Sequence, residues 1–160
     1  MRIIRGDLLQ LACDGAFDVI IHGCNCQCQM GRGIALSIKQ QFPEAYAADC
    51  RTPKGSREKL GSFSMAEVER NGRSFIVVNA YTQFHWRGNG VKADYDAIRK
   101  VMRTIAARFA DGRIGYPRIG AGLAGGDWSI ISSIIDEELA QLDHACVEFA
   151  PREEDRQAQG

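Results

Sequence analysis

Short apolar runs that alternate with helical periodicities predict a chain of mixed α and β structure. The segment Asp18–His22 is an apolar run flanked by turn residues, which is typical of a strand buried on both faces. By the same criteria, further strands are predicted at Arg2–Ile4, Gly61–Val68, Ser74–Ala80, Arg113–Pro117 and Cys146–Phe149.

Three other segments place apolar side chains three and four positions apart, the spacing of one helix face. In the longest of them the repeating positions are Tyr95, Ile98, Val101, Met102, Ile105 and Phe109. The predicted helices are Gly31–Gln41, Asp94–Phe109 and Ser129–Leu142. Pro43 either closes the first helix or starts the next turn.

The order of these elements predicts a three-layer α/β/α fold. Strands that alternate with helices form a mostly parallel sheet with helices on both faces. Asn71-Gly72, within the turn Arg70–Arg73, is a strong hairpin signal, so the sheet is expected to be mixed. No internal repeat or linker is visible, and residues 1–150 are predicted to form one domain. The polar residues 151–160 lack apolar periodicity and are expected to be a disordered tail.

Composition narrows the partners and the compartment. The 160 residues include 20 Lys plus Arg and 20 Asp plus Glu, so no net field attracts nucleic acid or an anionic membrane. We therefore expect neither a nucleic-acid groove nor a membrane partner, and we expect a monomer. The segment Met1–Asp7 lacks the long apolar stretch of a secretory signal, which makes the cytoplasm the expected location.

Six cysteines raise the question of disulfides or metal. Without an export signal a disulfide framework is unexpected, because cytosolic thiols stay reduced. Cys24, Cys26 and Cys28 are spaced by two, and no second pair follows at zinc-site spacing. We expect a tight loop here, with no metal and no cofactor.

Two glycine-rich loops carry the informative chemistry. One runs from Gly23 to Gly33 and the other from Gly120 to Gly126, and each joins a predicted strand to a predicted helix. Glycines there let a phosphate approach unpaired backbone amides at the positive end of the helix dipole. Two such loops suit a pyrophosphate. Neither matches the P-loop or the G-x-G-x-x-G fingerprint, which argues against an ordinary NTPase and a Rossmann dehydrogenase.

The order of several motifs resembles the macrodomain family over residues 1 to about 149. The motifs are Gly6-Asp7-Leu8-Leu9, Gly23-Cys24-Asn25, Met30-Gly31-x-Gly33-Ile34-Ala35, Asn79-Ala80-Tyr81-Thr82-Gln83 and Pro117-x-Ile119-Gly120-x-Gly122-Leu123. Within the family the chain is most similar to the ADP-ribose 1″-phosphate phosphatases and the lysine-using ADP-ribosyl hydrolases. The resemblance implies a macrodomain fold and, as partner, ADP-ribose or an ADP-ribosylated small molecule or macromolecule.

The resemblance also implies binding roles at matched positions. Asp7 would accept a hydrogen bond from the adenine amine, with the Leu8 backbone nearby, and Phe149 would place a ring near the adenosine. Asn25 would hold the distal ribose. The residues expected to pack on that ribose and its phosphate are Gly31, Gly33 and Ile34, and those expected to offer amides to the pyrophosphate are Gly120, Ala121, Gly122 and Leu123.

Two residues are candidate catalysts. His22 ends the strand before the first loop, so a neutral imidazole could act as general acid or base, or could be a buried, hydrogen-bonded core histidine. Asp127 could be catalytic or could cap the helix that follows it. The lysine-using hydrolases carry their lysine where this chain has Thr82-Gln83, which puts a covalent lysine route in doubt.

The expected function is therefore binding of ADP-ribose and hydrolysis of ADP-ribose 1″-phosphate to ADP-ribose and phosphate. Two alternatives stay open: a hydrolase that removes ADP-ribose from protein or nucleic acid, and an ADP-ribose reader without turnover. His85-Trp86 is interpreted as an exposed pair rather than a lid, and Lys54, Arg57 and Lys59 as solvated loop charges.

Overall fold

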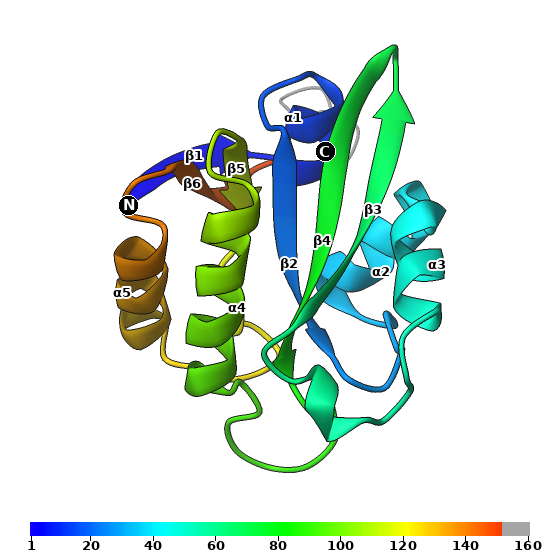
Figure 1. Ribbon diagram of the computed structural model, residues 1–160, viewed down its shortest axis with the longest axis vertical. Coiled ribbons are helices and arrows are strands. Elements are labelled where there is room, and N and C mark those ends of the chain that lie inside the picture. The colour runs from blue at the N-terminus through cyan, green and yellow to red at the C-terminus, as the bar shows by residue number, and fades with distance from the viewer. Residues whose placement is uncertain (152–160) are drawn as a thin grey trace, which may run out of the picture.

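A six-stranded sheet forms the centre of the computed structural model, which describes residues 1–151 (Figure 1). The strands are β1 (Arg2–Gly6), β2 (Val19–Asn25), β3 (Phe63–Arg70), β4 (Arg73–Gln83), β5 (Arg113–Tyr116) and β6 (Asp143–Phe149). Their order is β1-β6-β5-β2-β4-β3, and every neighbouring pair is parallel except β3 with β4. The predicted mixed, mostly parallel sheet and its hairpin are confirmed.

Helices cover both faces of the sheet and complete the predicted three layers (Figure 1). They are α1 (Leu8–Cys13), α2 (Gly33–Gln41), α3 (Pro43–Cys50), a short 3₁₀ turn η1 (Arg57–Lys59), α4 (Tyr95–Arg108) and α5 (Trp128–Glu138). The helices α4 and α5 share one apolar core with Val19 and Ile21 of β2, and the helices α1 to α3 share the other core with Ile20. As predicted, β2 is buried on both faces.

Two helices were not predicted, and both are short. The six residues of α1 span too few turns to show a periodicity, and Asp7 caps this helix by accepting hydrogen bonds from the amides of Leu9 and Gln10. The helix α3 begins at Pro43, so the proline starts a helix rather than a turn. The helix α5 ends at Glu138, four residues before the predicted end.

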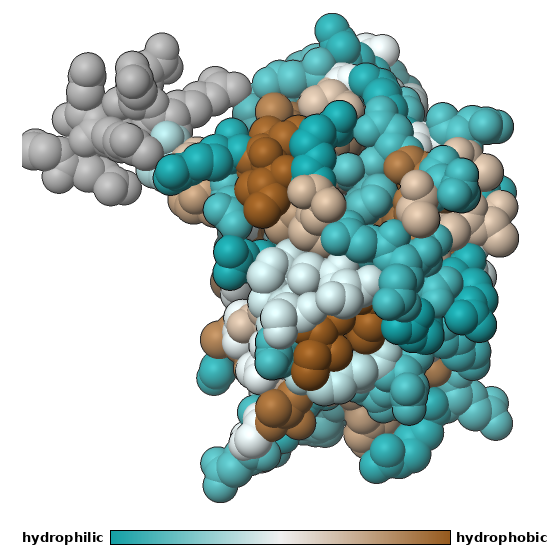
Figure 2. Space-filling model, turned by 90° about the vertical axis from the view of Figure 1, so that its left-hand side faces the viewer, coloured by the Kyte–Doolittle hydropathy of each residue, from teal (hydrophilic) through white to brown (hydrophobic). Residues whose placement is uncertain are grey.

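The surface carries no broad apolar face on the side seen in Figure 2, which shows the molecule from the side of α5 and the N-terminus. Apolar groups there form small separate patches among hydrophilic ones. Within residues 1–151, no helix has the length and apolarity that crossing a membrane requires. Of the predicted tail, residues 152–160 lie outside the described part of the chain.

Candidate functional site

Two adjoining cavities open where β1, β2, β4, β5 and β6 end and the following loops begin. The proximal cavity, of about 560 Å³, is bounded by the end of β1, the end of β6 and one side of α2. The distal cavity, of about 590 Å³, is bounded by both glycine-rich loops. Ile34, Pro117 and Arg118 line both, so the two cavities form one continuous cleft. The cleft lies at the carboxyl ends of parallel strands, where open α/β sheets bind ligands.

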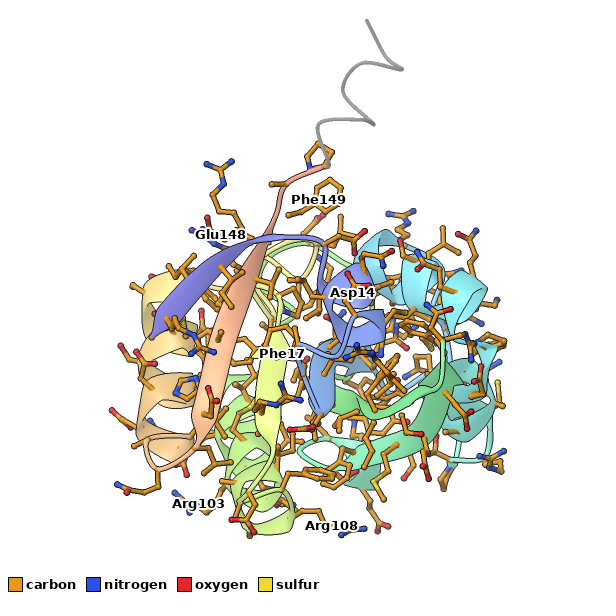
Figure 3. All side chains as sticks on the ribbon, turned by 90° about the horizontal axis from the view of Figure 1, so that it is seen from above. Asp14, Phe17, Arg103, Arg108, Glu148 and Phe149 are labelled. Atoms are coloured by element: carbon orange, nitrogen blue, oxygen red, sulfur yellow. The ribbon has the colours of Figure 1, made fainter. Side chains whose placement is uncertain are left out.

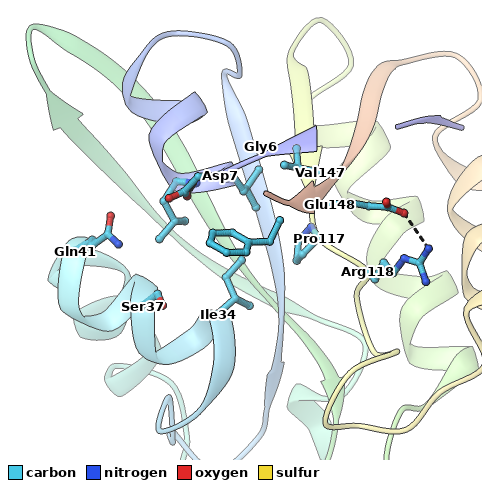
Figure 4. A pocket seen from close by; sticks show the side chains of 12 residues that line it. Gly6, Asp7, Ile34, Ser37, Gln41, Pro117, Arg118, Val147 and Glu148 are labelled. Atoms are coloured by element: carbon cyan, nitrogen blue, oxygen red, sulfur yellow. Dashed lines mark hydrogen bonds and ion pairs between the residues drawn. The ribbon is translucent and has the colours of Figure 1, made fainter. Parts of the chain in front are cut away.

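The proximal cavity combines an apolar floor with polar groups at its edge. Figure 4 shows Asp7 on one side, Ile34 below and Val147 with Pro117 opposite. Phe149, the last residue of β6, also lines the cavity while 72% of its surface stays exposed, and Figure 3 shows it beyond the end of the sheet. An exposed ring beside a cavity is a surface on which a planar base can stack.

The Asp7 carboxylate caps α1 and also lines the proximal cavity. Its Oδ1 accepts the two capping hydrogen bonds of α1, from Leu9 N at 3.0 Å and Gln10 N at 3.3 Å. Neither bond uses Oδ2, and the residue lines the proximal cavity together with Leu8. The structure therefore brings Asp7, Leu8 and Phe149 together at one end of the cleft, as the resemblance implied.

Asn25 shapes the first glycine-rich loop. Its Nδ2 donates to the carbonyl of Gln29 at 2.9 Å, and its Oδ1 accepts from the amide of Gln27 at 2.9 Å. These bonds fold the loop back on itself before α2 begins. Asn25 also lines the distal cavity, so a ligand would contact a side chain that is already fixed in place.

The start of α2 brings backbone rather than side chains to the distal cavity. Gly33, the first residue of α2, has a φ of +57°, a conformation that favours glycine. The space beside Gly31 is open, since a Cβ added there would meet no atom within 4 Å. The amides of the first helical turn have no partner within the helix. Gly31, Gly33 and Ile34 all line the cavity and leave this helix end open to an anion.

The second glycine-rich loop offers three free amides. None of the described residues accepts a hydrogen bond from the amides of Gly120, Gly122 or Leu123, and all three residues line the distal cavity. Gly120 has a φ of +73°, which turns the chain sharply after β5. Ala121 differs: its amide donates to the carbonyl of Arg118 at 3.2 Å and it does not line the cavity. The Ala121 amide, which the resemblance assigned to the pyrophosphate, closes the turn in this structure.

His22 lies in the interior and does not line the cleft. It is fully buried, and its Nε2 lies 2.6 Å from Oδ1 of Asn79. Burial lowers the pKa of the imidazole to about 4 and outweighs the opposing effect of the Asn79 hydrogen bond, so the ring is neutral near pH 7. Of the two interpretations, the hydrogen-bonded core histidine describes the position of His22 in this structure.

The helix-cap alternative also describes Asp127. Its Oδ1 accepts from the amide of Ser129 at 2.9 Å and from the Ser129 hydroxyl at 2.6 Å, at the start of α5. Hydrogen bonds from Ser129 lower the pKa of this carboxyl. The side chain is exposed to solvent and lines neither cavity. The structure thus separates both candidate catalysts from the cleft.

Several residues that sequence reasoning did not assign to the site line the distal cavity. They are Gln29, Arg32, Thr82, Trp86, Lys92 and Arg118. Trp86 is half-buried and stacks on His85 with ring centroids 4.1 Å apart, so its interpretation as a merely exposed residue was wrong. No local pattern marks Trp86 or Lys92, because the loop that carries them has no periodicity.

Behind the first loop lies a buried group of polar side chains. Lys59, expected to be a solvated loop charge, is 5% exposed and donates to the carbonyl of Cys26 at 3.2 Å. Cys24, Cys26 and Cys28 are buried, and burial raises the pKa of Cys24 well above its usual value. Within residues 1–151, no group of three or more His, Cys, Asp or Glu side chains is arranged to hold a metal ion. The hydrogen bond from Lys59 to the carbonyl of Cys26 holds the loop that carries Asn25.

Comparison with known proteins identifies the family. The family model described as Macro domain matches residues 21–135. Over 157 residues the chain is 34% identical to a 17.5 kDa protein from the tk-vs intergenic region of Enterobacteria phage T4, and the alignment covers 94% of this chain and 97% of that protein.

Two further relatives have names that describe an activity. A DNA ADP-ribosyl glycohydrolase of Thermus aquaticus is 25% identical over 146 residues, which cover 89% of this chain and 39% of that protein. An ADP-ribose 1″-phosphate phosphatase of Aspergillus oryzae is 27% identical over 180 aligned positions, which cover 86% of this chain and 88% of that protein. The chain thus spans about two fifths of the glycohydrolase.

A solved structure supports the fold. The macrodomain of Thermus aquaticus DarG superimposes with a TM-score of 0.70 at 23% identity and covers 94% of this chain and 97% of that one. This match supports the α/β fold of the chain. The chain belongs to the Macro domain family.

Proposed function

We propose that the protein binds ADP-ribose along the cleft and hydrolyses an ADP-ribosyl derivative. The continuity of the two cavities through Ile34, Pro117 and Arg118 carries this proposal. The proximal end offers the Asp7 carboxylate to an adenine amine and the Phe149 ring to the base. The distal end offers free amides to phosphates and Asn25 to a ribose hydroxyl.

The best-supported substrate is ADP-ribose 1″-phosphate. A relative with that phosphatase activity in its name matches 86% of this chain. The resemblance to the lysine-using hydrolases implies that their lysine would fall at Thr82-Gln83, where this chain has no amine. In the reaction water attacks phosphorus, the bond from phosphorus to the ribose oxygen breaks, and that oxygen takes up a proton. The products are ADP-ribose and inorganic phosphate.

The described lining of the distal cavity includes two arginines and a lysine but no Asp, Glu or His. Its residues can bind and orient the phosphate that water attacks and stabilise the charge that develops on it. Neither His22 nor Asp127 takes part in the proposal, since neither reaches the cavity. The cavity therefore acts through binding and electrostatic stabilisation.

Phosphorus NMR of ADP-ribose 1″-phosphate tests the proposal. We expect shifted pyrophosphate signals on binding and growth of an inorganic phosphate signal. Gly122→Glu should abolish both: a Cβ at Gly122 meets no atom within 4 Å, so the fold tolerates the side chain while its charge repels the pyrophosphate. Ala140→Glu adds the same charge at an exposed position away from the cleft and should behave as wild type. Unshifted signals with wild-type protein would refute ADP-ribose binding.

The second candidate is removal of ADP-ribose from nucleic acid, favoured by the alignment with the Thermus glycohydrolase. An oligonucleotide that carries ADP-ribose distinguishes the two activities, because release of ADP-ribose from it requires cleavage of a glycosidic bond rather than a phosphate ester. Binding of ADP-ribose with turnover of neither substrate would identify a reader.

A further inference from the structure

The two ends of the cleft differ in charge. The proximal cavity is lined by two acidic residues, Asp7 and Glu148, and by one basic residue, Arg118. The distal cavity is lined by Arg32, Lys92 and Arg118, and none of its described lining residues is acidic. The chain as a whole has equal numbers of basic and acidic residues, so this asymmetry belongs to the cleft.

Two of the three distal cations have no carboxylate partner in the described part of the chain. Arg118 is paired with Glu148 at 2.8 Å, and Figure 4 shows this pair beside the proximal cavity. Lys92 Nζ donates to the neutral carbonyl of Gly90 at 3.1 Å. Neither Lys92 nor Arg32 forms an ion pair with any residue from 1 to 151.

The backbone fixes the position of Lys92 against the second glycine-rich loop. The amides of Lys92 and Ala93 both donate to the carbonyl of Ala124, at 2.8 and 3.3 Å, and the amide of Asp94 donates to the carbonyl of Thr82 at 2.8 Å. These bonds hold the half-buried Lys92 beside the loop with the free amides. Lys92 therefore lines the distal cavity beside this loop.

Arg32 is placed where a cation is unfavourable unless an anion is bound. It is the N-cap of α2, its side chain makes no capping hydrogen bond, and the positive end of the helix dipole lies beside it. A bound phosphate would be attracted by the helix end and by the guanidinium group together. Arg32 and Lys92 lie on different loops, and both line the distal cavity.

We propose that Arg32 and Lys92 bind a phosphate monoester carried by the distal ribose, in addition to the pyrophosphate, and that they set a preference for phosphorylated over plain ADP-ribose. This inference rests on the proposed function for the identity of the ligand. A phosphodiester next to the ribose, as in nucleic acid, has related chemistry, and the experiment separates the two sources.

Tryptophan fluorescence should report ligand binding, because Trp86 lines the distal cavity. Stopped-flow mixing gives the dissociation constants before turnover. Lys92→Gln should weaken binding of ADP-ribose 1″-phosphate about tenfold and change that of ADP-ribose less than about twofold. Arg32→Gln should act in the same direction. Lys92→Arg keeps the charge and should retain the preference, and Lys100→Gln, exposed on α4, should match wild type.

The salt dependence adds a readout that a structural role would not change. Binding of ADP-ribose 1″-phosphate should lose part of its sensitivity to ionic strength in Lys92→Gln. Equal weakening of both ligands, or of neither, would overturn the inference, as would an effect confined to an oligonucleotide that carries ADP-ribose. Failure of wild-type protein to bind ADP-ribose would refute the proposed function instead.

Discussion

Replacing His22 by Gln tests whether this histidine is a core residue or a catalyst. The imidazole is fully buried on the side of β2 that faces α3. The amide of Asn79 donates to the carbonyl of Ala45 and to the Ser64 hydroxyl, which leaves Asn79 Oδ1 as the acceptor of the His22 Nε2–H. A glutamine amide can donate to the same oxygen but cannot titrate.

The magnitude follows from the pKa of His22, which falls from an ordinary 6.5 to about 4 on folding. Between these values the unfolded chain binds a proton that the native protein excludes, so the free energy of unfolding falls as the pH falls. Each pKa unit corresponds to about 1.4 kcal/mol, so the shift of His22 lowers the free energy of unfolding by about 3 kcal/mol. This loss is reached at and below pH 4. Above about pH 7 the group contributes no slope.

Urea denaturation of wild type and His22→Gln across this pH range provides the assay. The difference between the two curves isolates His22 from the carboxyl groups and from His144, whose pKa burial also lowers. We expect the wild-type free energy of unfolding to fall by about 3 kcal/mol more than that of the variant. Parallel curves, or a loss of turnover of about a hundredfold or more with unchanged ADP-ribose affinity, would refute the core assignment.

Three further substitutions test the site. Asp127→Ala removes the cap of α5 and should lower the free energy of unfolding by about 1 kcal/mol without changing ADP-ribose affinity; a loss of affinity would place Asp127 in the site. Asp7→Ser keeps a capping side chain and should weaken the binding of ADP-ribose about tenfold, as measured by calorimetry. An unchanged Kd would exclude the adenine contact. Phe149→Ala removes a ring that is 72% exposed, so it should leave Tm unchanged and weaken the binding of ADP-ribose. A lower Tm would indicate a packing role.

Much of the fold could be predicted from the sequence because its signals are local. An apolar run without alternation predicted the doubly buried β2, and Asn71-Gly72 predicted the β3–β4 hairpin. Glycines between a strand and a helix predicted both loops of the cleft, since positive φ and close approach select glycine. The six-residue α1 escaped prediction because periodicity needs more than one or two turns to be visible.

Only the tertiary structure decided which side chains meet in the cleft. Successive residues of a strand point to opposite faces, so His22 and Gly23 could not share a side, but the sequence does not say on which side the cavity lies. The placement of the second loop beside Gly23 puts the cavity there and leaves His22 in the core. Arg32 and Lys92 come from loops far apart in the sequence, and both line the distal cavity. The position of Lys92 there depends on backbone bonds such as that from Lys92 to Ala124, which no local pattern encodes.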